Sequence, residues 1–472
     1  MKKLIIGAVL AAMLSTPTHA QDIPGALKKL DDITAAVAAA KALLQPSLPT
    51  APPVVAIPTL NPMPTIANAP ANAILVLDSN SSYAAIDLTG PANGKVIIGG
   101  SCPEGRFLPG AQAVARVNHL TATSASGWTV RCVDLNGDPS LLYEVVSLDP
   151  SASHITLDRV FVHSSGQRRG IALNCIDGTV TNSYISGFLD TPVGGDTQGI
   201  GIWLGTGPYT ITNNYIEAGS ENIFVDASVG MGVGNVPSDI LIKGNTLNKP
   251  AVWHDGRNHN VKNLLEFKAG RRVRVEDNDL SGNWADGQSG FAVVLTVRND
   301  DGQTPWATIE HFVYINNRVS RAPAGINFLG HDDGGRQSGQ ANDIQILNST
   351  FALDTTIAAA PSAVSAARTV QMFGAPQNVA FDHVTVAVNG WLSTIFTFGA
   401  GTAPDAPIVG LSVTNCEFVQ GAYGIIGNAM GTGLATLNIV APSIIWTNVI
   451  VHNGGNGADG FVSFPAGTTI VP

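Results

Sequence analysis

The chain has 472 residues, of which 51 are Gly and 28 are Pro, and only 13% are charged. The 25 Lys and Arg residues against 35 Asp and Glu residues give a formal net charge of -10. This charge excludes a broad basic surface for nucleic acid or anionic membranes, and Gly and Pro are too few for a collagen or low-complexity chain. A soluble, weakly charged, turn-rich protein with an extensive core is expected.

Residues 1–20 have the layout of a secretory signal. Lys2 and Lys3 form a basic start, residues 4–14 form an apolar stretch, and small residues lead to a cleavage site after Ala20. The apolar stretch is shorter than the roughly 20 residues that a transmembrane helix needs. We therefore expect a secreted or periplasmic protein with no membrane span.

Two short segments separate this signal from the main domain. Residues 21–45 are expected to form a short helix, because apolar residues recur at three- and four-residue intervals from Leu27 onward. Residues 46–72 contain eight prolines among Ala and Thr, a composition typical of an extended linker. The segments fit either a processed tail or a tethering helix, and the main domain is expected over residues 73–472.

The chain has four cysteines, and export makes disulfide bonds available to them. Cys102 and Cys132 are close enough in sequence to form one bridge, although spacing alone leaves the pairing open. Cys175 and Cys416 fall near strand-like segments and are expected to be buried. No Cys and His cluster has the spacing of a structural zinc site.

A strand-like segment recurs from Leu157 to Trp446. The interval between successive copies runs from 23 residues (Leu157 to Val180) to 39 residues (Val275 to Tyr314). In each copy one residue and the residue five positions after it are apolar, and alternating inward residues are typical of β-strands. The first of these residues in each copy, the anchors, are Leu157, Val180, Ile211, Ile242, Val275, Tyr314, Ile346, Phe381, Val413 and Trp446.

Most copies have a turn-favouring residue two positions after the anchor. Asn or Gly at a fixed offset indicates a chain that bends at the same corner in each repeat. Stacked Asn side chains can also hydrogen-bond along such a corner. These corner residues are Arg159, Asn182, Asn213, Gly244, Asp277, Asn316, Asn348, His383, Asn415 and Asn448.

A second family of short strands lies between these copies, from residues 170–174 to residues 423–426. Two or three strands per repeat without helices between them predict an all-β fold, a parallel β-helix of about ten coils. A β-sandwich would not keep one corner residue in phase over ten units, and a propeller blade is usually longer than this repeat.

Over roughly residues 75–465 the chain resembles the right-handed parallel β-helix proteins of the pectate-lyase-like superfamily. The segments 209–223, 236–240, 262–268 and 298–302 are similar to an exported bacterial subgroup known mainly by its fold. The resemblance implies an acidic or neutral polysaccharide as partner. The chain has neither the Arg-x-Pro-x-x-Arg segment of pectate lyases nor the Arg-x-Lys signature of polygalacturonase-like hydrolases, so catalytic residues are not carried over.

Charged residues gather in the central repeats of an otherwise weakly charged chain. Glu266 and Lys268 share one face of a strand, since alternate residues do, and Arg298 ends the next strand. A lyase acting on a uronate needs a base and cationic groups or Ca²⁺. Lys268 or Arg298 is a candidate base or clamp, and candidate Ca²⁺ ligands are Asp300, Asp301, Asp332 and Asp333.

The same residues leave other functions open. A glycosidase needs two carboxyl groups, and Glu266 with Asp300 or Asp332 is a candidate pair. A solvated, salt-bridged strand face is equally compatible with the pattern. Candidate substrate contacts in the central repeats are Trp203, Trp284, Trp306, Asn299 and His331.

The last repeats look like scaffold, because residues 394–401 and 421–433 carry no charge. An export signal, a Pro-rich spacer and a repetitive domain also suit a noncatalytic surface or adhesin-like module that binds carbohydrate. The central clustering of charges and aromatic residues favours a polysaccharide lyase over this alternative.

Overall fold

A computed structural model describes residues 51–138, 140–163, 166–191, 194–299, 302–357, 367–399, 407–454 and 463–472. The expected signal, the expected helix over residues 21–45 and the first residues of the expected linker lie outside this part of the chain. Pro53–Pro472 form one compact unit, and the fold described below is that of this unit.

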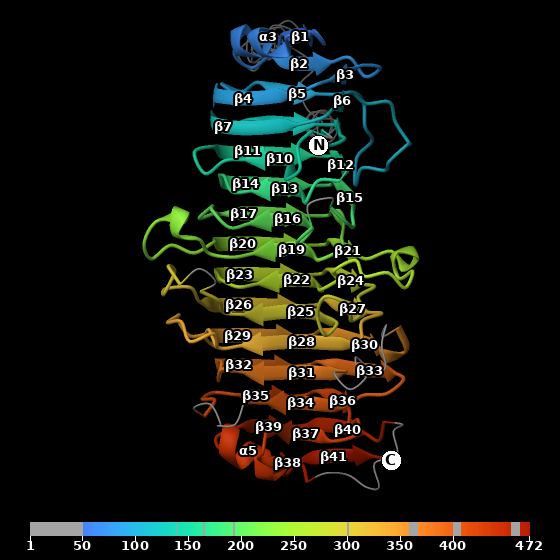
Figure 1. Ribbon diagram of the computed structural model, residues 1–472, viewed down its shortest axis with the longest axis vertical. Helices are drawn as coiled ribbons and strands as arrows, with labels where there is room; N and C mark the ends of the chain where they lie inside the picture. The colour runs from blue at the N-terminus through green and yellow to red at the C-terminus, as the bar shows by residue number, and fades with distance from the viewer. Residues whose placement is uncertain are drawn as a thin grey trace, which may run out of the picture. The chain divides into compact units, whose positions relative to one another are not determined.

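The described strands stack into three parallel ladders, which appear as three columns in Figure 1. Ladder 1 and ladder 2 are continuous in one sheet, and ladder 3 forms a second sheet of 14 strands. Each turn of the chain passes through ladder 1, then ladder 3, then ladder 2, and its strands pair with the matching strands of the next turn. The expected all-β fold is confirmed.

Ladder 1 contains the repeat predicted from the sequence. Every anchor from Leu157 to Trp446 is the direct pairing partner of the next. The same register continues toward the N-terminus through Val130, Ile97 and Leu75, so the stack exceeds the ten predicted repeats. The strands of ladder 1 are β1 (Val54–Ile57), β2 (Ile74–Leu77), β5 (Val96–Ile98), β8 (Thr129–Arg131), β11 (Ser153–Asp158), β14 (Ile176–Thr181), β17 (Tyr209–Thr212), β20 (Ser238–Lys243), β23 (Gly270–Glu276), β26 (Ile309–Ile315), β29 (Asn342–Leu347), β32 (Gln377–Asp382), β35 (Ser412–Thr414) and β39 (Ile445–Thr447).

Ladder 2 contains the second strand family and carries the polar face described in the next section. A short antiparallel strand, β38 (Gly431–Thr432), pairs with its last member. The strands of ladder 2 are β4 (Ile86–Pro91), β7 (Leu120–Ser126), β10 (Glu144–Leu148), β13 (Arg169–Leu173), β16 (Gln198–Ile202), β19 (Glu221–Val225), β22 (Asn263–Phe267), β25 (Phe291–Thr296), β28 (Ala324–Leu329), β31 (Arg368–Phe373), β34 (Thr394–Phe398) and β37 (Gly424–Gly427).

Ladder 3 takes the apolar residues that lie five positions after the anchors, such as Val162, Ile185 and Ile216, which pair in register. These side chains and the anchors are buried together in one continuous core. Burial of each large apolar side chain contributes about 1.5–3 kcal/mol. The strands of ladder 3 are β3 (Ser82–Tyr83), β6 (Arg116–Val117), β9 (Asp134–Leu135), β12 (Phe161–His163), β15 (Tyr184–Phe188), β18 (Tyr215–Ala218), β21 (Thr246–Asn248), β24 (Asp279–Ser281), β27 (Arg318–Ser320), β30 (Thr350–Asp354), β33 (Thr385–Asn389), β36 (Glu417–Val419), β40 (Val449–His452) and β41 (Thr468–Val471).

The corner between ladders 1 and 3 is left-handed in each predicted repeat. All ten corner residues have φ between 45° (Asn348) and 65° (Gly244), the region that Asn, Asp and Gly tolerate best. The predicted bend is confirmed. Some corner side chains also hydrogen-bond along the stack, as from Asn213 Nδ2 to Asn182 Oδ1 at 2.8 Å.

A longer, buried amide ladder stands one residue after the corner. The side-chain oxygen of Asn245 accepts the backbone N–H of Asn214 at 2.9 Å, and that of Asn278 accepts the backbone N–H of Asn245 at the same distance. Each side chain thereby satisfies a buried backbone group of the coil before it. The ladder consists of Ser183, Asn214, Asn245, Asn278, Asn317 and Ser349.

The N-terminal boundary differs from the sequence expectation. Residues 54–68, within the expected linker, include β1 and the helix α3 (Pro62–Asn68), in which Ile66 is buried in the core. β1 pairs with β2, so the Pro-rich composition does not keep this segment extended. Pro62 opens the helix, where its missing N–H costs nothing.

Short helices and a disulfide bond complete the described part of the chain. The remaining helices are α5 (Leu434–Val440) and the short η1 (Val229–Met231), η2 (Ala251–Trp253) and η3 (Thr355–Ile357). Among the described residues no helix is long and apolar enough to cross a membrane. Cys102 and Cys132 form the expected disulfide, whereas Cys175 and Cys416 are free and buried, also as expected.

Candidate functional site

A column of polar side chains runs along the outer side of ladder 2. Each stands two residues before a core residue of its strand, and each is the pairing partner of the next. Together with Phe224 and Glu266, which point outward further along the same strands, they form what we call the central face. The column consists of Glu144, Arg169, Gln198, Glu221 and Asn263.

Hydrogen bonds join this column across successive coils. Arg169 donates from Nη1 to Glu144 Oε1 at 2.9 Å and from Nε to Gln198 Oε1 at 2.7 Å. Gln198 in turn donates from Nε2 to Glu221 Oε2 at 2.8 Å. Because the strands stack about 4.8 Å apart, the column is a continuous polar strip along the axis of the helix.

Lys262 and Asp196 lie beside Glu221. The Nζ atom of Lys262 is 2.5 Å from Asp196 Oδ2 and 3.4 Å from Glu221 Oε1. Asn260 donates to the other oxygen of Asp196 at 2.9 Å. Two loops, before β16 and before β22, are therefore joined through one lysine that also contacts the buried Glu221.

Glu221 and Glu266 are the two buried acids of the central face, only 1% and 3% exposed. Burial and the charge of Glu266 raise the pKa of Glu221. Burial also raises the pKa of Glu266, although the positive charge of Lys268 and a 2.7 Å hydrogen bond from Asn263 offset part of this rise. Both side chains therefore hold their protons to a higher pH than an exposed glutamate does.

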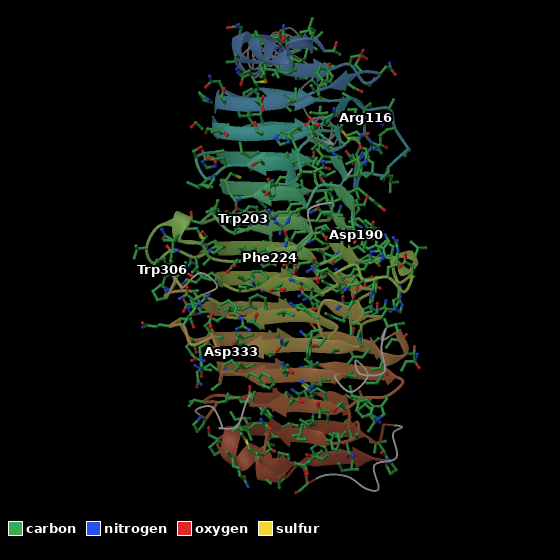
Figure 2. The ribbon with its side chains drawn as sticks, in the orientation of Figure 1. Arg116, Asp190, Trp203, Phe224, Trp306 and Asp333 are labelled. Atoms are coloured by element: carbon green, nitrogen blue, oxygen red, sulfur yellow. A yellow bond between two sulfur atoms is a disulfide. The ribbon has the colours of Figure 1, made fainter. Side chains whose placement is uncertain are left out.

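Two cations lie over aromatic rings on the central face. The guanidinium of Arg169 is 4.4 Å from the ring centre of Trp203, and the Nζ atom of Lys268 is 5.4 Å from that of Phe224. Gly201 makes room for the first pair, since a Cβ there would lie 2.9 Å from the Trp203 ring. Figure 2 shows Trp203 and Phe224 close together over the middle of the sheet.

Glu266, Lys268 and Arg298 lie on or directly after two neighbouring strands of ladder 2, β22 and β25. Lys268 follows Glu266 by two residues, and the backbone N–H of Arg298 donates to the carbonyl of Lys268 at 3.2 Å. The side chain of Arg298 forms an ion pair with Asp333. Of the predicted catalytic residues, Lys268 and Arg298 are partly exposed and Glu266 is buried.

Asn299 does not face a substrate. It is buried, and its side chain accepts from the backbone N–H and hydroxyl of Thr304 and donates to the carbonyl of Gln337. The expected substrate contact is therefore a loop-fixing residue, because its polar atoms are already hydrogen-bonded within the protein. His331 is partly exposed, and its Nδ1 atom lies 3.1 Å from the carbonyl of Asp332.

The expected Ca²⁺ ligands are not assembled in the part of the chain that the structure describes. Asp332 is buried and accepts backbone N–H groups from Asn299 and Gly334, each at 2.7 Å. Burial works to raise the pKa of Asp332, yet these bonds leave it lowered. Asp300 and Asp301 lie outside the described residues, and the described residues contain no cluster of three or more potential metal ligands.

Two of the predicted aromatic contacts lie away from the central face. Trp284 is 3% exposed and packs against His254, so its ring has no free face for a sugar. Trp306 donates from Nε1 to the carbonyl of Asn235 at 2.9 Å and packs among apolar residues of neighbouring loops. Figure 2 shows it at the edge of the molecule, apart from Trp203.

The sequence reasoning missed part of the central face, including Arg169, Gln198 and Glu221. A signal for them is present, since they stand two residues before Ile171, Ile200 and Ile223, which form the core column of ladder 2. Alignment of the second strand family on these core residues would have revealed the polar column. Asp196, Lys262 and Phe224 were also missed, and the two loop residues have no periodic signal.

Comparisons with known proteins identify no family. No protein-family model and no curated protein matches the sequence. Among solved structures, the A-module of mannuronan C-5 epimerase AlgE6 of Azotobacter vinelandii is 12% identical, with a TM-score of 0.49 over 83% of this chain and 93% of that chain. A mannuronic acid specific polysaccharide family 6 lyase from human gut microbiota is 12% identical, with a TM-score of 0.49 over 86% of each chain.

A third solved structure, the catalytic domain of a GH87 α-1,3-glucanase, is 13% identical, with a TM-score of 0.49 over 90% of this chain and 69% of that chain. The parallel β-helix fold of this chain rests on the pairing of its own strands, and these likenesses give it no family, activity or substrate.

Proposed function

We propose that this is an exported protein that binds acidic polysaccharide along the central face and cleaves uronate-containing chains by β-elimination. The observation that supports this proposal is the pair of cation–aromatic contacts on neighbouring strands, Arg169 with Trp203 and Lys268 with Phe224, above two buried acids. Export rests on the signal expected over residues 1–20.

The charge balance of the central face favours an anionic ligand. The raised pKa values of Glu221 and Glu266 weaken the negative charge that these acids place on the central face, where three cations stand beside the carboxylates of Glu144 and Asp196. The cations are Arg169, Lys262 and Lys268. Guanidinium and ammonium groups pair with the carboxylates of uronates, while Trp203 and Phe224 offer apolar surface to the sugar rings.

Lys268 is the proposed base of the elimination. Its amine takes the proton from carbon 5 of the uronate, the freed electron pair forms the C4–C5 double bond, and the C4–oxygen bond breaks. The ammonium then returns the proton to the departing oxygen, so no co-reactant is needed. Arg298, next to Lys268, stabilises the charge that develops on the uronate carboxylate.

Glu266 acts as a positioning residue in this proposal, since it is 3% exposed and stands two residues before Lys268. The positive charge of Lys268 works against the rise in the pKa of Glu266 that burial causes, so the two side chains interact and Glu266 helps to hold Lys268 in place. A glycosidase is the second candidate function, favoured by the raised pKa of both buried acids, since a catalytic acid needs such a shift.

The test exposes the purified protein to polymannuronate, polygalacturonate and a neutral glucan, with and without Ca²⁺. Ultraviolet absorbance of unsaturated uronates and new reducing ends are followed together. Both signals are expected to rise on a uronate polymer and to be lost in Lys268→Gln. The matched control is Lys243→Gln, a lysine on the outer side of the neighbouring ladder. An increase in reducing ends without the ultraviolet signal would identify a hydrolase. If neither signal rises but the protein is retained by a polysaccharide in an affinity gel, it is a noncatalytic binding module.

A further inference from the structure

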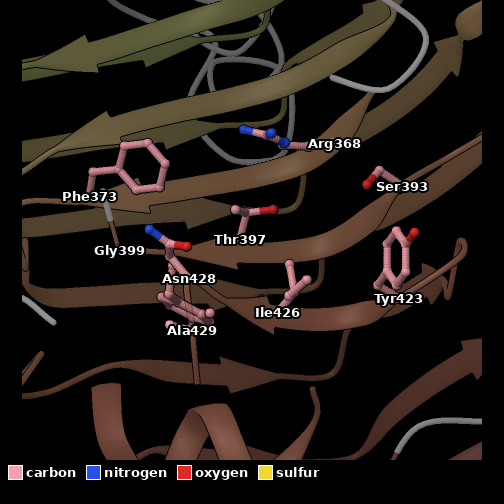
Figure 3. Close-up of a pocket in the computed structure, with 11 residues that line it drawn as sticks. Arg368, Phe373, Ser393, Thr397, Gly399, Tyr423, Ile426, Asn428 and Ala429 are labelled. Carbon is pink, nitrogen blue, oxygen red and sulfur yellow. The ribbon is translucent and has the colours of Figure 1, made fainter. Parts of the chain in front are cut away.

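A cavity of about 550 Å³ opens on ladder 2 in the C-terminal coils, between β31, β34 and β37 (Figure 3). This size falls in the range of small-ligand sites, roughly 300–1,000 Å³. The part of the chain from which it is built was expected to be scaffold. The residues that line it are Arg368, Phe373, Ser393, Thr397, Phe398, Gly399, Tyr423, Ile426, Gly427, Asn428 and Ala429.

Arg368 is the one charged residue among those lining residues. It stands two residues before the core residue Val370, the offset that Glu221 occupies on the central face. Its guanidinium contacts the side chain of Gln371, and among the described residues no carboxylate forms an ion pair with it. Burial lowers the pKa of Arg368, because the guanidinium lacks full hydration there.

The other walls suit a sugar ring better than a bare ion. Tyr423 stands at the cavity with 49% of its surface exposed, and Phe398 and Ile426 add apolar surface. Thr397 supplies a hydroxyl, which lies 2.7 Å from the hydroxyl of Thr394. Aromatic surface next to a few polar groups and one cation matches a sugar that carries a carboxylate.

We propose that this cavity is a second, noncatalytic binding site for a sugar acid. The carboxylate of a uronate pairs with the guanidinium of Arg368, which can bind it through two parallel hydrogen bonds, and the sugar ring lies against Tyr423. We infer a binding role because no Asp, Glu, His or Lys lines the cavity.

This inference deepens the proposed function, since it rests on an acidic polysaccharide as the ligand. Four coil steps separate β22 from β34, which corresponds to about 19 Å along the axis. A polymer that runs along ladder 2 would therefore meet the central face and the cavity in turn.

Methionine methyl groups offer a local readout of the cavity in the full protein. Met430 lies beside the lining, since a Cβ at Gly427 would be 2.9 Å from its Sδ atom. Met63 lies in α3 at the opposite end of the stack. We would titrate methyl-labelled protein with a mannuronate or a galacturonate trisaccharide, with maltotriose and acetate as the neutral-sugar and simple-anion arms.

The Met430 methyl resonance is expected to move with one of the uronate trisaccharides, while that of Met63 stays in place. Arg368→Gln should weaken this response at least tenfold and Arg368→Lys by a smaller factor, because lysine keeps the charge but loses the paired hydrogen bonds. The matched control is Arg321→Gln, which removes an arginine from a smaller cavity that also contains Asp354. Unchanged Met63 and Met372 resonances would verify that each variant is folded.

Three results would overturn the inference. The Met430 methyl resonance could fail to shift with both uronate trisaccharides, or it could shift equally with maltotriose or acetate. The Arg368→Gln variant could also bind the uronate as tightly as the parent protein. These results are separable from a failure of the proposed function. If Lys268→Gln loses turnover but the Met430 methyl resonance of the parent protein does not shift with uronate, the cavity site alone is refuted. A shifted Met430 in a protein without turnover would refute the elimination and leave the cavity site in place.

Discussion

The central face and the C-terminal cavity use the same backbone position for different chemistry. Glu221 in β19 and Arg368 in β31 stand at the same offset in ladder 2, four strands apart. The central face surrounds its buried acids with Arg169 and Lys262, whereas the cavity has one cation and neutral walls. The stacked coils therefore set where side chains point, and the residue types underlie the different roles that we propose for the two regions.

The two regions also differ at the corner that closes each coil. In the central coils the residue after the corner is Asn or Ser and belongs to the buried amide ladder. In the C-terminal coils the same position is apolar, as in Val384, Cys416 and Val449. Buried polar networks fix one register when every group is satisfied, so we infer that the ladder keeps the coils under the central face in strict alignment.

The largest expected effect is on kcat, which should depend on the central face and not on the C-terminal cavity. Lys268→Gln should lower kcat on a uronate polymer about 10²–10⁴-fold, the usual contribution of a general base. Arg368→Gln should leave kcat in place and raise KM, because the cavity only binds. Initial rates of unsaturated uronate formation measure both. Equal losses of kcat in the two variants would end the distinction between a catalytic face and a binding cavity.

The next effect concerns the amide ladder. Asn245→Ala removes hydrogen bonds to Asn214, Asn278 and Ile211 and leaves a buried N–H without a partner, so we expect it to lower the free energy of unfolding by about 3 kcal/mol. Cys416→Ala, at the matching position of an apolar coil, should cost about 1 kcal/mol. Urea unfolding gives both values, and similar costs would show that the ladder has no special importance.

A smaller effect should appear in the pH dependence of stability. Since the folded protein raises the pKa of Glu221, its contribution to stability is full below the unfolded glutamate value of about 4.3 and declines as pH rises toward the folded value. Glu221→Gln should therefore make the unfolding free energy less sensitive to rising pH.

Glu276 provides a control of opposite sign. A hydrogen bond from Lys243 lowers the pKa of Glu276, so its stabilising contribution is present at neutral pH and declines as pH falls below about 4.3. Glu276→Gln should slightly destabilise the neutral protein. Urea unfolding across this pH range would contradict the account if Glu221→Gln behaved in the same way as Glu276→Gln.

The smallest effect concerns single aromatic rings. Trp203→Ala should weaken binding of a uronate polymer about fivefold, since one ring with its cation is worth about 1 kcal/mol. Affinity electrophoresis measures this change, with Trp306→Ala as the matched tryptophan control. A stronger effect of Trp306→Ala would place the polymer at the loop edge instead of the central face.

The strand repeat could be predicted because the anchors keep a fixed environment. Each anchor from Leu157 to Trp446 faces the same core and precedes the same left-handed corner, so apolar and turn-favouring residues recur in phase. The extension to Leu75 was missed, since the positions two residues after Leu75 and Val130 are Leu77 and Cys132 and lack the turn-favouring Asn or Gly of the later corners.

The sequence predicted only those site residues that lie on regular strands. Glu266 and Lys268 could be placed on one face, because they belong to a regular strand. Trp284, Asn299 and Asp332 lie in loops, where burial depends on contacts with distant segments that no periodic pattern encodes. The residues from 54 to 68 show the same limit, since a Pro-rich composition predicts a linker but does not reveal the packing of Ile66.

The central claim is that acidic polysaccharide lies along the outer side of ladder 2, and hydroxyl-radical footprinting tests it most directly. Oxidation of Trp203 and Phe224 would be measured by mass spectrometry with and without a uronate polymer, with Trp306 as the internal reference (Figure 2). The account predicts that the polymer protects Trp203 and Phe224 and leaves Trp306 as reactive as before. Protection of Trp306 with undiminished oxidation of Trp203 and Phe224 would contradict it.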